Sequence, residues 1–381
     1  MAAVNHTSKT FTLNTGAKIP AIGLGTWQSQ PGEVEKAVES ALRSGYRHID
    51  TAFAYQNETE VGVGIKASGV PREQIWLTTK LDNPWHKRAA EAIDASLKNL
   101  GTDYVDLYLI HWPCSTNPNM KEVYSDWDYV DTWREMQKLV ETGKVKNIGV
   151  SNFGQKHLER LLADPSCKIV PAVNQIELHP NNPSPKLVAY NTSKGIHSTA
   201  YSCLGSTASP LHKDATLLQL AEKKGRSPQQ VMLVWNITKG RSVIPKSVSA
   251  DRIQANYEID GLELTEEDIK VIDSMQGRFK VCDGSFLPQN YMEKVFYHDD
   301  EVPQYRMRAP LGDPPSPASS THNYSCWIAE PPRLQSTITQ PIAAAVRPCA
   351  PALVCDALST FVIANSQLSC EEPAGQGANE G

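Results

Sequence analysis

Short hydrophobic runs alternate with amphipathic stretches between about residue 21 and residue 256. The runs are rich in β-branched residues and are bounded by polar residues, which is typical of buried strands. We predict strands at 22–25, 47–50, 75–80, 105–111, 146–151, 172–177, 197–202 and 242–245.

The stretches between these strands carry apolar residues at helical spacing. We predict helices at 33–44, 58–67, 88–99, 130–142, 155–163, 185–194, 214–224 and 249–256. Glycines that end a helix follow several of these stretches, at Gly45, Gly101, Gly143, Gly195 and Gly225. Ser227 followed by Pro228 predicts the start of a further helix, and Thr265 followed by acidic residues predicts another.

Repetition of strand and helix over this length predicts an α/β fold, a (β/α)8 TIM barrel. A doubly wound sheet is the alternative, and it requires a glycine fingerprint between its first strand and first helix. Residues 23–28 contain only half of that fingerprint, and residues 62–67 match it but lie inside a predicted helix. We therefore interpret both as chance matches.

Both ends of the chain differ from this repeat. Residues 11–20 predict a small hairpin that turns at 14–16 and caps the barrel. Residues 277–300 predict a loop whose aromatic side chains fold over a pocket mouth. Residues 305–381 contain no lysine, ten of the 26 prolines and four of the eight cysteines, and this composition predicts a disordered tail. We predict a barrel domain at 1–304 and a tail at 305–381.

Composition narrows the class of protein. With 381 residues, 40% of them hydrophobic, the chain can bury a large core. A net charge of −5 disfavours binding to nucleic acid or to an acidic membrane surface, and we expect no membrane span and no signal peptide. The body cysteines form no CxxC motif, and we expect no metal ligands and a cytoplasmic protein with reduced thiols. Those cysteines are Cys114, Cys167, Cys203 and Cys282.

Four residues that transfer or position protons lie at or just past the ends of predicted strands. They are Asp50, Tyr55, Lys80 and His111. Because the carboxyl ends of parallel strands meet at one face, we expect these side chains to surround one crevice. A tyrosine has an ordinary pKa of about 10, and a neighbouring cationic lysine would lower it. Tyr55 could then donate a proton to a developing alkoxide, with Asp50 balancing Lys80 and His111 orienting the carbonyl.

Several motifs resemble the signature blocks of the aldo-keto reductases, in the order of that family and over residues 10–300. They are Gly23-Leu-Gly-Thr-Trp27, Gly45-Tyr-Arg-His-Ile-Asp-Thr-Ala52, Asp106-Leu-Tyr-Leu-Ile-His-Trp-Pro113, Ile148-Gly-Val-Ser-Asn-Phe153 and Ile244-Pro-Lys-Ser247. Residues 174–180 and 183–202 resemble fungal NADP-dependent alcohol, glycerol or aldehyde reductases most. The resemblance implies a TIM barrel, a monomer, and NADPH bound in an extended form. It also implies reversible, NADPH-dependent reduction of a small-molecule aldehyde or ketone to an alcohol, the substrate being a small or hydroxylated aldehyde or a carbonyl of secondary metabolism.

The same resemblance assigns roles to individual residues. It implies a catalytic tetrad of Asp50, Tyr55, Lys80 and His111, with Tyr55 as general acid. The implied cofactor-binding residues are Gly25, Thr26, Ser151, Asn152, Gln175, Tyr201, Ser202, Leu204, Ser206, Lys246, Ser247, Val248, Arg252 and Asn256. Trp27 and Trp112 would line the substrate pocket. Lys246 and Arg252 are cations suited to a 2′-phosphate, which favours NADPH over NADH.

Three positions depart from the family pattern. Cys203 stands where the family has proline, and Ala255 stands where it often has glutamate. Asp82 stands where tryptophan is frequent. We expect Asp82 to make the substrate pocket more polar, which favours a small or hydroxylated aldehyde such as glyceraldehyde over a bulky apolar one.

Three other interpretations remain open from the sequence. In a barrel aldolase Lys80 would form a Schiff base, which requires an uncharged lysine, whereas Asp50 should keep Lys80 charged. A barrel that binds NADPH without turnover would act as a sensor or partner subunit. A tail that displaces residues 277–300 would produce an inactive or partner-binding variant.

Overall fold

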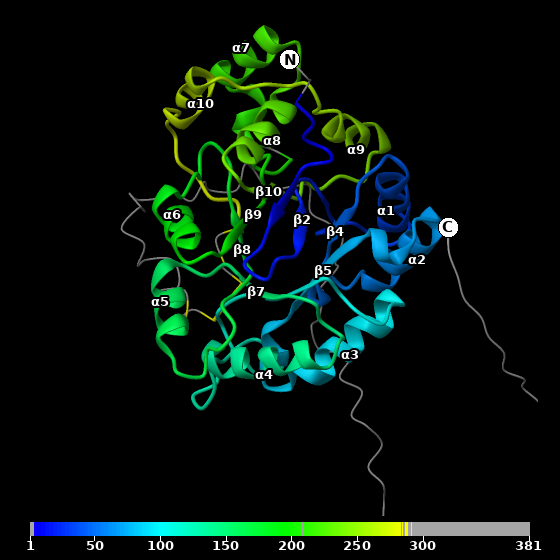
Figure 1. The fold of residues 1–381 in the computed structure, drawn as a ribbon, viewed down its shortest axis with the longest axis vertical. Coiled ribbons are helices and arrows are strands. Elements are labelled where there is room, and N and C mark those ends of the chain that lie inside the picture. Colours follow the sequence, from blue (N-terminus) through cyan, green and yellow to red (C-terminus); the bar gives the residue numbers. More distant parts are fainter. Residues whose placement is uncertain (1–3, 208, 283, 285, 289–290, 292–381) are drawn as a thin grey trace, which may run out of the picture. The chain divides into compact units, whose positions relative to one another are not determined.

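The computed structural model contains an eight-stranded parallel sheet, ringed by helices, in the part of the chain that it describes (Figure 1). The described residues are 4–207, 209–282, 284, 286–288 and 291. Each strand pairs with its neighbours in chain order. The strands are β3 (Leu24–Gly25), β4 (His48–Asp50), β5 (Trp76–Leu81), β6 (Leu107–Ile110), β7 (Ile148–Ser151), β8 (Val173–Glu177), β9 (His197–Tyr201) and β10 (Ser242–Val243). The sequence prediction of these strands is confirmed, with ends that differ by one or two residues.

Backbone contacts join the segments at the two ends of the strand order. The Val243 amide donates to the Ala21 carbonyl at 2.9 Å, and the Gly23 amide donates to the Val243 carbonyl at 2.8 Å. A Cβ atom on Gly25 would lie 2.9 Å from the carbonyl oxygen of Ile244. Glycine is therefore required where the first strand approaches the last segment.

The N-terminal hairpin packs against one end of the sheet, as the sequence predicts. Its antiparallel strands are β1 (Thr10–Thr12) and β2 (Lys18–Pro20). Leu13 and Ile19 of the hairpin join a buried cluster with Trp76 and Leu107, which are the first residues of β5 and β6. The hairpin thus covers the amino ends of the strands, in the middle of the view in Figure 1. It leaves the opposite, carboxyl ends of the strands uncovered.

The helices follow the strands in the predicted order. They are α1 (Val34–Arg43), α2 (Glu58–Ser68), α3 (Ala89–Leu100), α4 (Tyr129–Glu141), α5 (Gln155–Ala163), α6 (Pro185–Ser193), α7 (Ala215–Lys224), α8 (Pro228–Thr238), α9 (Ala250–Tyr257) and α10 (Glu266–Asp273). The Ser227 side chain accepts from the backbone of Gln230, and the Thr265 side chain accepts from that of Asp268. These capping boxes begin α8 and α10, as their sequences predict.

The glycines of 62–67 serve helix packing. They lie within α2, and a Cβ on Gly62 would stand 2.4 Å from the Leu100 carbonyl oxygen at the end of α3. A Cβ on Gly64 would stand 2.6 Å from the Glu35 carbonyl oxygen of α1. Helices α1, α2 and α3 can approach one another closely because these side chains are absent. The match to a dinucleotide fingerprint is therefore a chance match, as we inferred.

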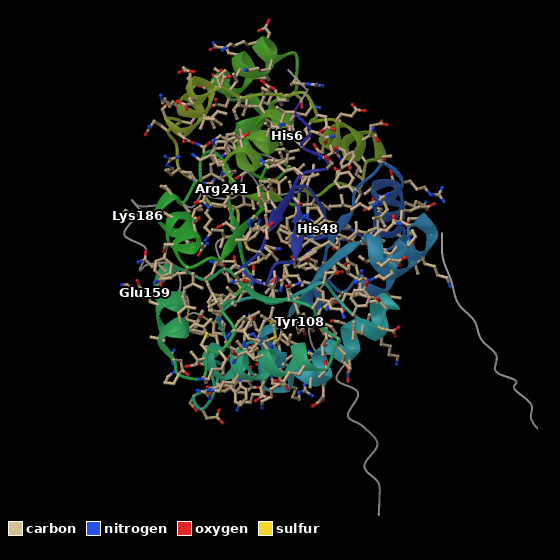
Figure 2. The ribbon with its side chains drawn as sticks, in the orientation of Figure 1. His6, His48, Tyr108, Glu159, Lys186 and Arg241 are labelled. Carbon is tan, nitrogen blue, oxygen red and sulfur yellow. The ribbon has the colours of Figure 1, made fainter. Side chains whose placement is uncertain are left out.

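Most charged side chains lie at the surface, and some polar side chains are buried among the strands. Glu159 and Lys186 extend outward at the periphery, whereas His48 lies at the centre of the strand ring (Figure 2). Among the described residues, no helix combines the length and the apolar character that a membrane span needs. The predicted tail at 305–381 and the domain boundary at 304 lie outside the described residues.

Candidate active site

A buried ion pair lies at the carboxyl ends of β4 and β5. Lys80 Nζ is 2.5 Å from Asp50 Oδ1, and the two side chains are 1% and 2% exposed. Lys80 Nζ also donates to the carbonyl of Thr51 at 2.8 Å and to the Tyr55 hydroxyl at 3.3 Å. The short helix η1 (Phe53–Tyr55), directly after β4, positions Tyr55. Three of the four residues implied for the tetrad are therefore connected through one ammonium group.

The ammonium group of Lys80 stays charged. Burial lowers the pKa of Lys80, but the charges of Asp50 and Tyr55 outweigh burial, and the pKa of Lys80 lies above its ordinary value. Burial raises the pKa of Asp50, while Lys80 and Gln175 oppose that rise. A charged lysine is a poor Schiff-base nucleophile, so this environment disfavours the aldolase interpretation.

Burial decides the acidity of Tyr55 in this arrangement. Burial raises the pKa of Tyr55, and Lys80 opposes the rise without cancelling it. The sequence predicted a lowered pKa because it indicated the charge of Lys80 but not the partial burial of the phenol in the cavity wall. Tyr55 is therefore protonated at neutral pH and can act as a proton donor.

His111 lies directly after β6, beside Tyr55. The two rings lie edge to face, with centroids 5.6 Å apart. Burial holds the pKa of His111 well below its usual range, and the charges of Lys80 and His86 lower it further. His111 is therefore neutral at neutral pH. The sequence indicated the position of His111 but not this charge state.

A hydrogen-bonded group from the ends of β7 and β9 and the middle of β8 borders the tetrad. Gln175 Nε2 donates to Asp50 Oδ2 at 2.6 Å, and Ser151 Oγ donates to the carbonyl of Gln175 at 2.9 Å. The Tyr201 hydroxyl donates to Asn152 Oδ1 at 2.7 Å. The contact between Gln175 and Asp50 was not predicted, because the sequence implied only a cofactor role for Gln175.

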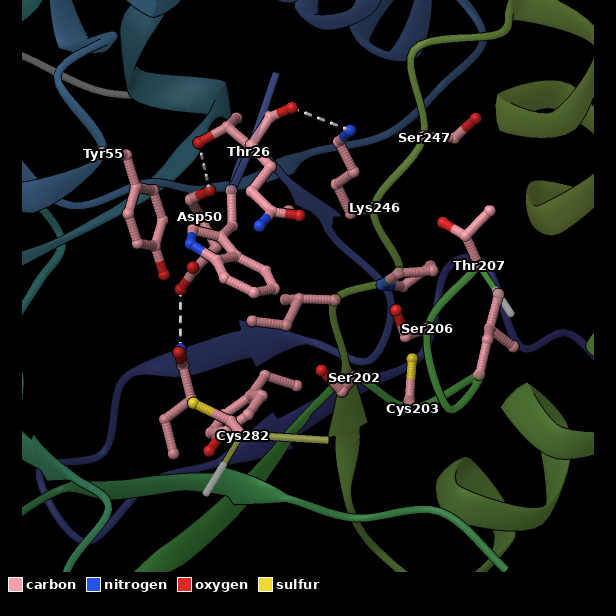
Figure 3. Close-up of a pocket in the computed structure, with 18 of the residues that line it drawn as sticks. Thr26, Asp50, Tyr55, Ser202, Cys203, Ser206, Thr207, Lys246, Ser247 and Cys282 are labelled. Carbon is pink, nitrogen blue, oxygen red and sulfur yellow. Dashed lines mark hydrogen bonds between the residues drawn. The ribbon is translucent and has the colours of Figure 1, made fainter. Parts of the chain in front are cut away.

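A cavity of about 790 Å³ extends from these residues across the carboxyl ends of the strands. Figure 3 shows Asp50 and Tyr55 on one side of it, Ser247 and Thr207 on the other, and Ser202 and Cys203 between them. Every residue for which the sequence implied a role lines this cavity except Lys80, which lies buried beside Asp50 and Tyr55. Arg252 and Asn256 of α9 line its far end.

Two cations meet at that far end. Lys246 Nζ donates to the carbonyl of Gln28 at 3.2 Å, which connects the segment after β10 with the loop after β3 (Figure 3). Burial lowers the pKa of Lys246, and Arg252 lowers it further, whereas Glu33 raises it. Two neighbouring positive charges at one end of a cavity suit an anionic group such as a phosphate.

The loop of residues 201–206 lies along the middle of the cavity. Ser202 and Ser206 have positive φ angles of 44° and 72°, in the left-handed region. Cys203, at the position of the family proline, is fully buried, and burial raises the pKa of its thiol to about 12. It therefore acts as a packing residue.

The substrate side of the cavity has aromatic walls. Trp27 is 43% exposed, and Trp112 meets Phe286 edge to face with centroids 5.2 Å apart. Phe286 lines the cavity, as we expected of the aromatic residues in 277–300. Phe296 and Tyr297 of the same segment lie outside the described residues. The sequence missed several lining residues, because most of them come from loops and short helical turns that periodicity does not describe, and Gln229 lies in the first turn of α8. These residues are Gln28, Ala54, Met120, Thr207, His212, Gln229 and Cys282.

Comparison with known proteins identifies the family. The model of the aldo/keto reductase family matches residues 21–276. The chain is 45% identical over 291 residues to a glycerol 2-dehydrogenase (NADP(+)) of Saccharomyces cerevisiae, covering 72% of this chain and 93% of that protein. It is 46% identical over 278 residues to a D-galacturonate reductase of Hypocrea jecorina, covering 69% of this chain and 89% of the relative.

A solved structure shares the fold. The aldose reductase from Schistosoma japonicum superposes with a TM-score of 0.67 at 38% identity, covering 71% of this chain and 93% of the other. These matches confirm the resemblance in the sequence motifs and favour an enzyme over a non-catalytic barrel. The chain belongs to the aldo/keto reductase family and is an oxidoreductase that acts on carbonyl and alcohol groups.

Proposed function

We propose that this protein reduces small, hydroxylated aldehydes such as glyceraldehyde with NADPH, in a reversible reaction. One observation carries the proposal: the Tyr55 hydroxyl lies 3.3 Å from the charged ammonium of Lys80, which Asp50 holds at 2.5 Å. This arrangement delivers a proton at the wall of a cavity large enough for a cofactor and a substrate.

The four tetrad residues have separate tasks in this mechanism. The Tyr55 hydroxyl donates its proton to the carbonyl oxygen, and Lys80 stabilises the phenolate that remains. Asp50 keeps Lys80 charged and in position. His111, as a neutral imidazole, orients the carbonyl oxygen toward Tyr55 by a hydrogen bond.

The cavity fits NADPH by the chemistry of its donors. Lys246 and Arg252 would bind the 2′-phosphate, with Ser247, Val248 and Asn256 around the adenosine. The 201–206 loop would cover the pyrophosphate through Ser202, Leu204 and Ser206, beside Gly25 and Thr26. Ser151, Asn152 and Gln175 would hold the carboxamide, and Tyr201 would stack on the nicotinamide. When bound, NADPH supplies the hydride.

The relatives support this choice of cofactor and substrate. The yeast glycerol 2-dehydrogenase is named for NADP(+), and another relative, 42% identical, is an aldehyde reductase of the same yeast. Both names describe a polyhydroxylated or an aldehyde substrate, whereas the D-galacturonate reductase is named for a polyhydroxylated aldehyde that also carries a carboxylate. Trp27 and Trp112 at the mouth would pack against such a substrate.

The remaining proposals concern the whole molecule. The hydrogen bonds between Val243 and the segment before β3 support a closed (β/α)8 barrel. The division into a catalytic domain at 1–304 and a low-complexity segment at 305–381 stays a prediction from composition. We further propose that the protein acts as a cytoplasmic monomer. Size-exclusion chromatography with light scattering tests the oligomeric state.

The direct test follows NADPH absorbance with DL-glyceraldehyde. Tyr55→Phe should reduce turnover by about 10²–10⁴-fold, the usual contribution of a general acid. Tyr108→Phe is the matched control, because Tyr108 is also buried in the sheet and its hydroxyl has no hydrogen-bond partner among the described residues. Equal turnover in the two variants would refute the role of Tyr55. A truncation after residue 304 shows whether the tail alters turnover.

A further inference from the structure

Asp82 presents a carboxylate to the substrate side of the cavity. It directly follows β5, two residues past Lys80, and lines the cavity together with Trp112 and Phe286. Its Oδ1 accepts from the amide of Asn83 at 2.9 Å and caps the short helix η3 (Asn83–Arg88). This contact leaves Oδ2 as an acceptor for a bound molecule.

The cations closest to Asp82 in sequence are engaged elsewhere. Lys80 pairs with Asp50, and Lys87 pairs with Asp126 at 2.7 Å. Among the described residues, no basic side chain forms an ion pair with Asp82. Burial raises the pKa of Asp82 to about 6, against the effect of the Asn83 amide. The carboxylate is thus mainly ionised at neutral pH.

The walls beside this carboxylate are aromatic. Trp112 is buried, and Trp27 and Phe286 are 43% and 52% exposed at the mouth. Aromatic faces pack against carbon–hydrogen bonds, whereas an unpaired carboxylate accepts hydrogen bonds from hydroxyls and repels anions. A neutral polyhydroxylated chain offers both complementary features, and an aldehyde that bears a carboxylate does not.

We propose that Asp82 is a specificity-determining residue that accepts a hydrogen bond from a substrate hydroxyl and excludes anionic aldehydes. The inference rests on the proposed function, because it concerns the substrate end of the same cavity. It separates two substrate groups that the tetrad would treat alike, since the tetrad acts only at the carbonyl.

The test compares two pairs of aldehydes by kcat/KM with NADPH. D-glyceraldehyde and propanal differ in hydroxyls, and succinic semialdehyde and butanal differ in a carboxylate. The variants are Asp82→Asn and Asp82→Ser, which remove the charge but retain an oxygen that can cap η3. Asp94→Asn is the control, since Asp94 is exposed on α3, pairs with Lys144 and does not line the cavity.

We expect Asp82→Asn to raise the kcat/KM for succinic semialdehyde, relative to that for butanal, by about tenfold, because the substitution removes a nearby like charge. The kcat/KM for glyceraldehyde, relative to that for propanal, should fall by about tenfold, which is the usual contribution of a hydrogen bond to a charged acceptor. Both ratios should stay unchanged in Asp94→Asn. If either ratio stays unchanged in both Asp82 variants while the wild type turns over normally, this inference is wrong. If the wild type reduces none of the four aldehydes, the proposed function fails, and the inference fails with it.

Discussion

Gln175 Nε2 donates a hydrogen bond of 2.6 Å to Asp50 Oδ2, the carboxylate oxygen that Lys80 does not bind. Both side chains are buried, so loss of the Gln175 amide would leave the buried Oδ2 of Asp50 without this donor. Gln175 therefore has a second task besides its proposed cofactor contact, which is to hold Asp50 ionised and oriented toward Lys80.

Replacing Gln175 by leucine tests this task. A hydrogen bond to a charged group contributes about 1.5–3 kcal/mol, so Gln175→Leu should lower kcat by about tenfold or more. The kcat at saturating NADPH separates this effect from weaker cofactor binding. Gln155→Leu, on the outer helix α5, serves as control. An increase in the KM for NADPH with unchanged kcat would assign Gln175 to cofactor binding alone.

The cations at the far end of the cavity should determine the choice of cofactor. Arg252→Ala removes a positive charge beside Lys246, so the KM for NADPH should rise about tenfold while the KM for NADH changes little. Lys144→Ala, which removes an exposed lysine that pairs with Asp94, is the control. An equal rise in the KM for NADPH and the KM for NADH would mean that Arg252 contacts a group that the two cofactors share.

Asp82 predicts a pH dependence for anionic aldehydes. Its pKa is raised to about 6, so protonation below that pH removes the repelling charge. The kcat/KM for succinic semialdehyde, relative to butanal, should rise as pH falls through about 6, and Asp82→Asn should abolish that rise. Five titratable groups on the surrounding elements keep their protonation state in this range. The pKa values of His111 and His86 are lowered, and those of Lys80, Tyr55 and Tyr108 are raised. A rise that persists in Asp82→Asn would point to another group.

Acid should destabilise the fold through His48. Burial lowers the pKa of His48 from 6.5 to about 3, so the unfolded chain binds a proton over a range in which the folded chain does not. The contribution of neutral His48 to the unfolding free energy is fully present above pH 6.5. It is lost as pH falls toward 3, at about 1.4 kcal/mol per pH unit. Urea titrations of the wild type and His48→Gln should therefore converge in unfolding free energy as pH falls. A difference that is independent of pH would contradict this.

The order of the elements was readable because each depends on local patterns. Runs of β-branched residues, helix-ending glycines such as Gly101 and caps such as Ser227 act over a few residues, and the structure has these elements where the patterns predict them. The motifs with Asp50 and His111 stand at strand ends, so parallel pairing alone brings them to one face. The sequence by itself therefore determined the family and the order of the elements, and it indicated the residues of the proposed tetrad.

Tertiary structure decided the properties that depend on burial and on loops. The partial burial of Tyr55 reverses the expected direction of its pKa, and burial makes His111 neutral. The contact of Gln175 with Asp50 joins β8 to β4, strands that are not neighbours in the sheet. Residues such as Met120 and His212 reach the cavity through loops. Desolvation and contacts across many residues set these features, and no short pattern in the sequence encodes them.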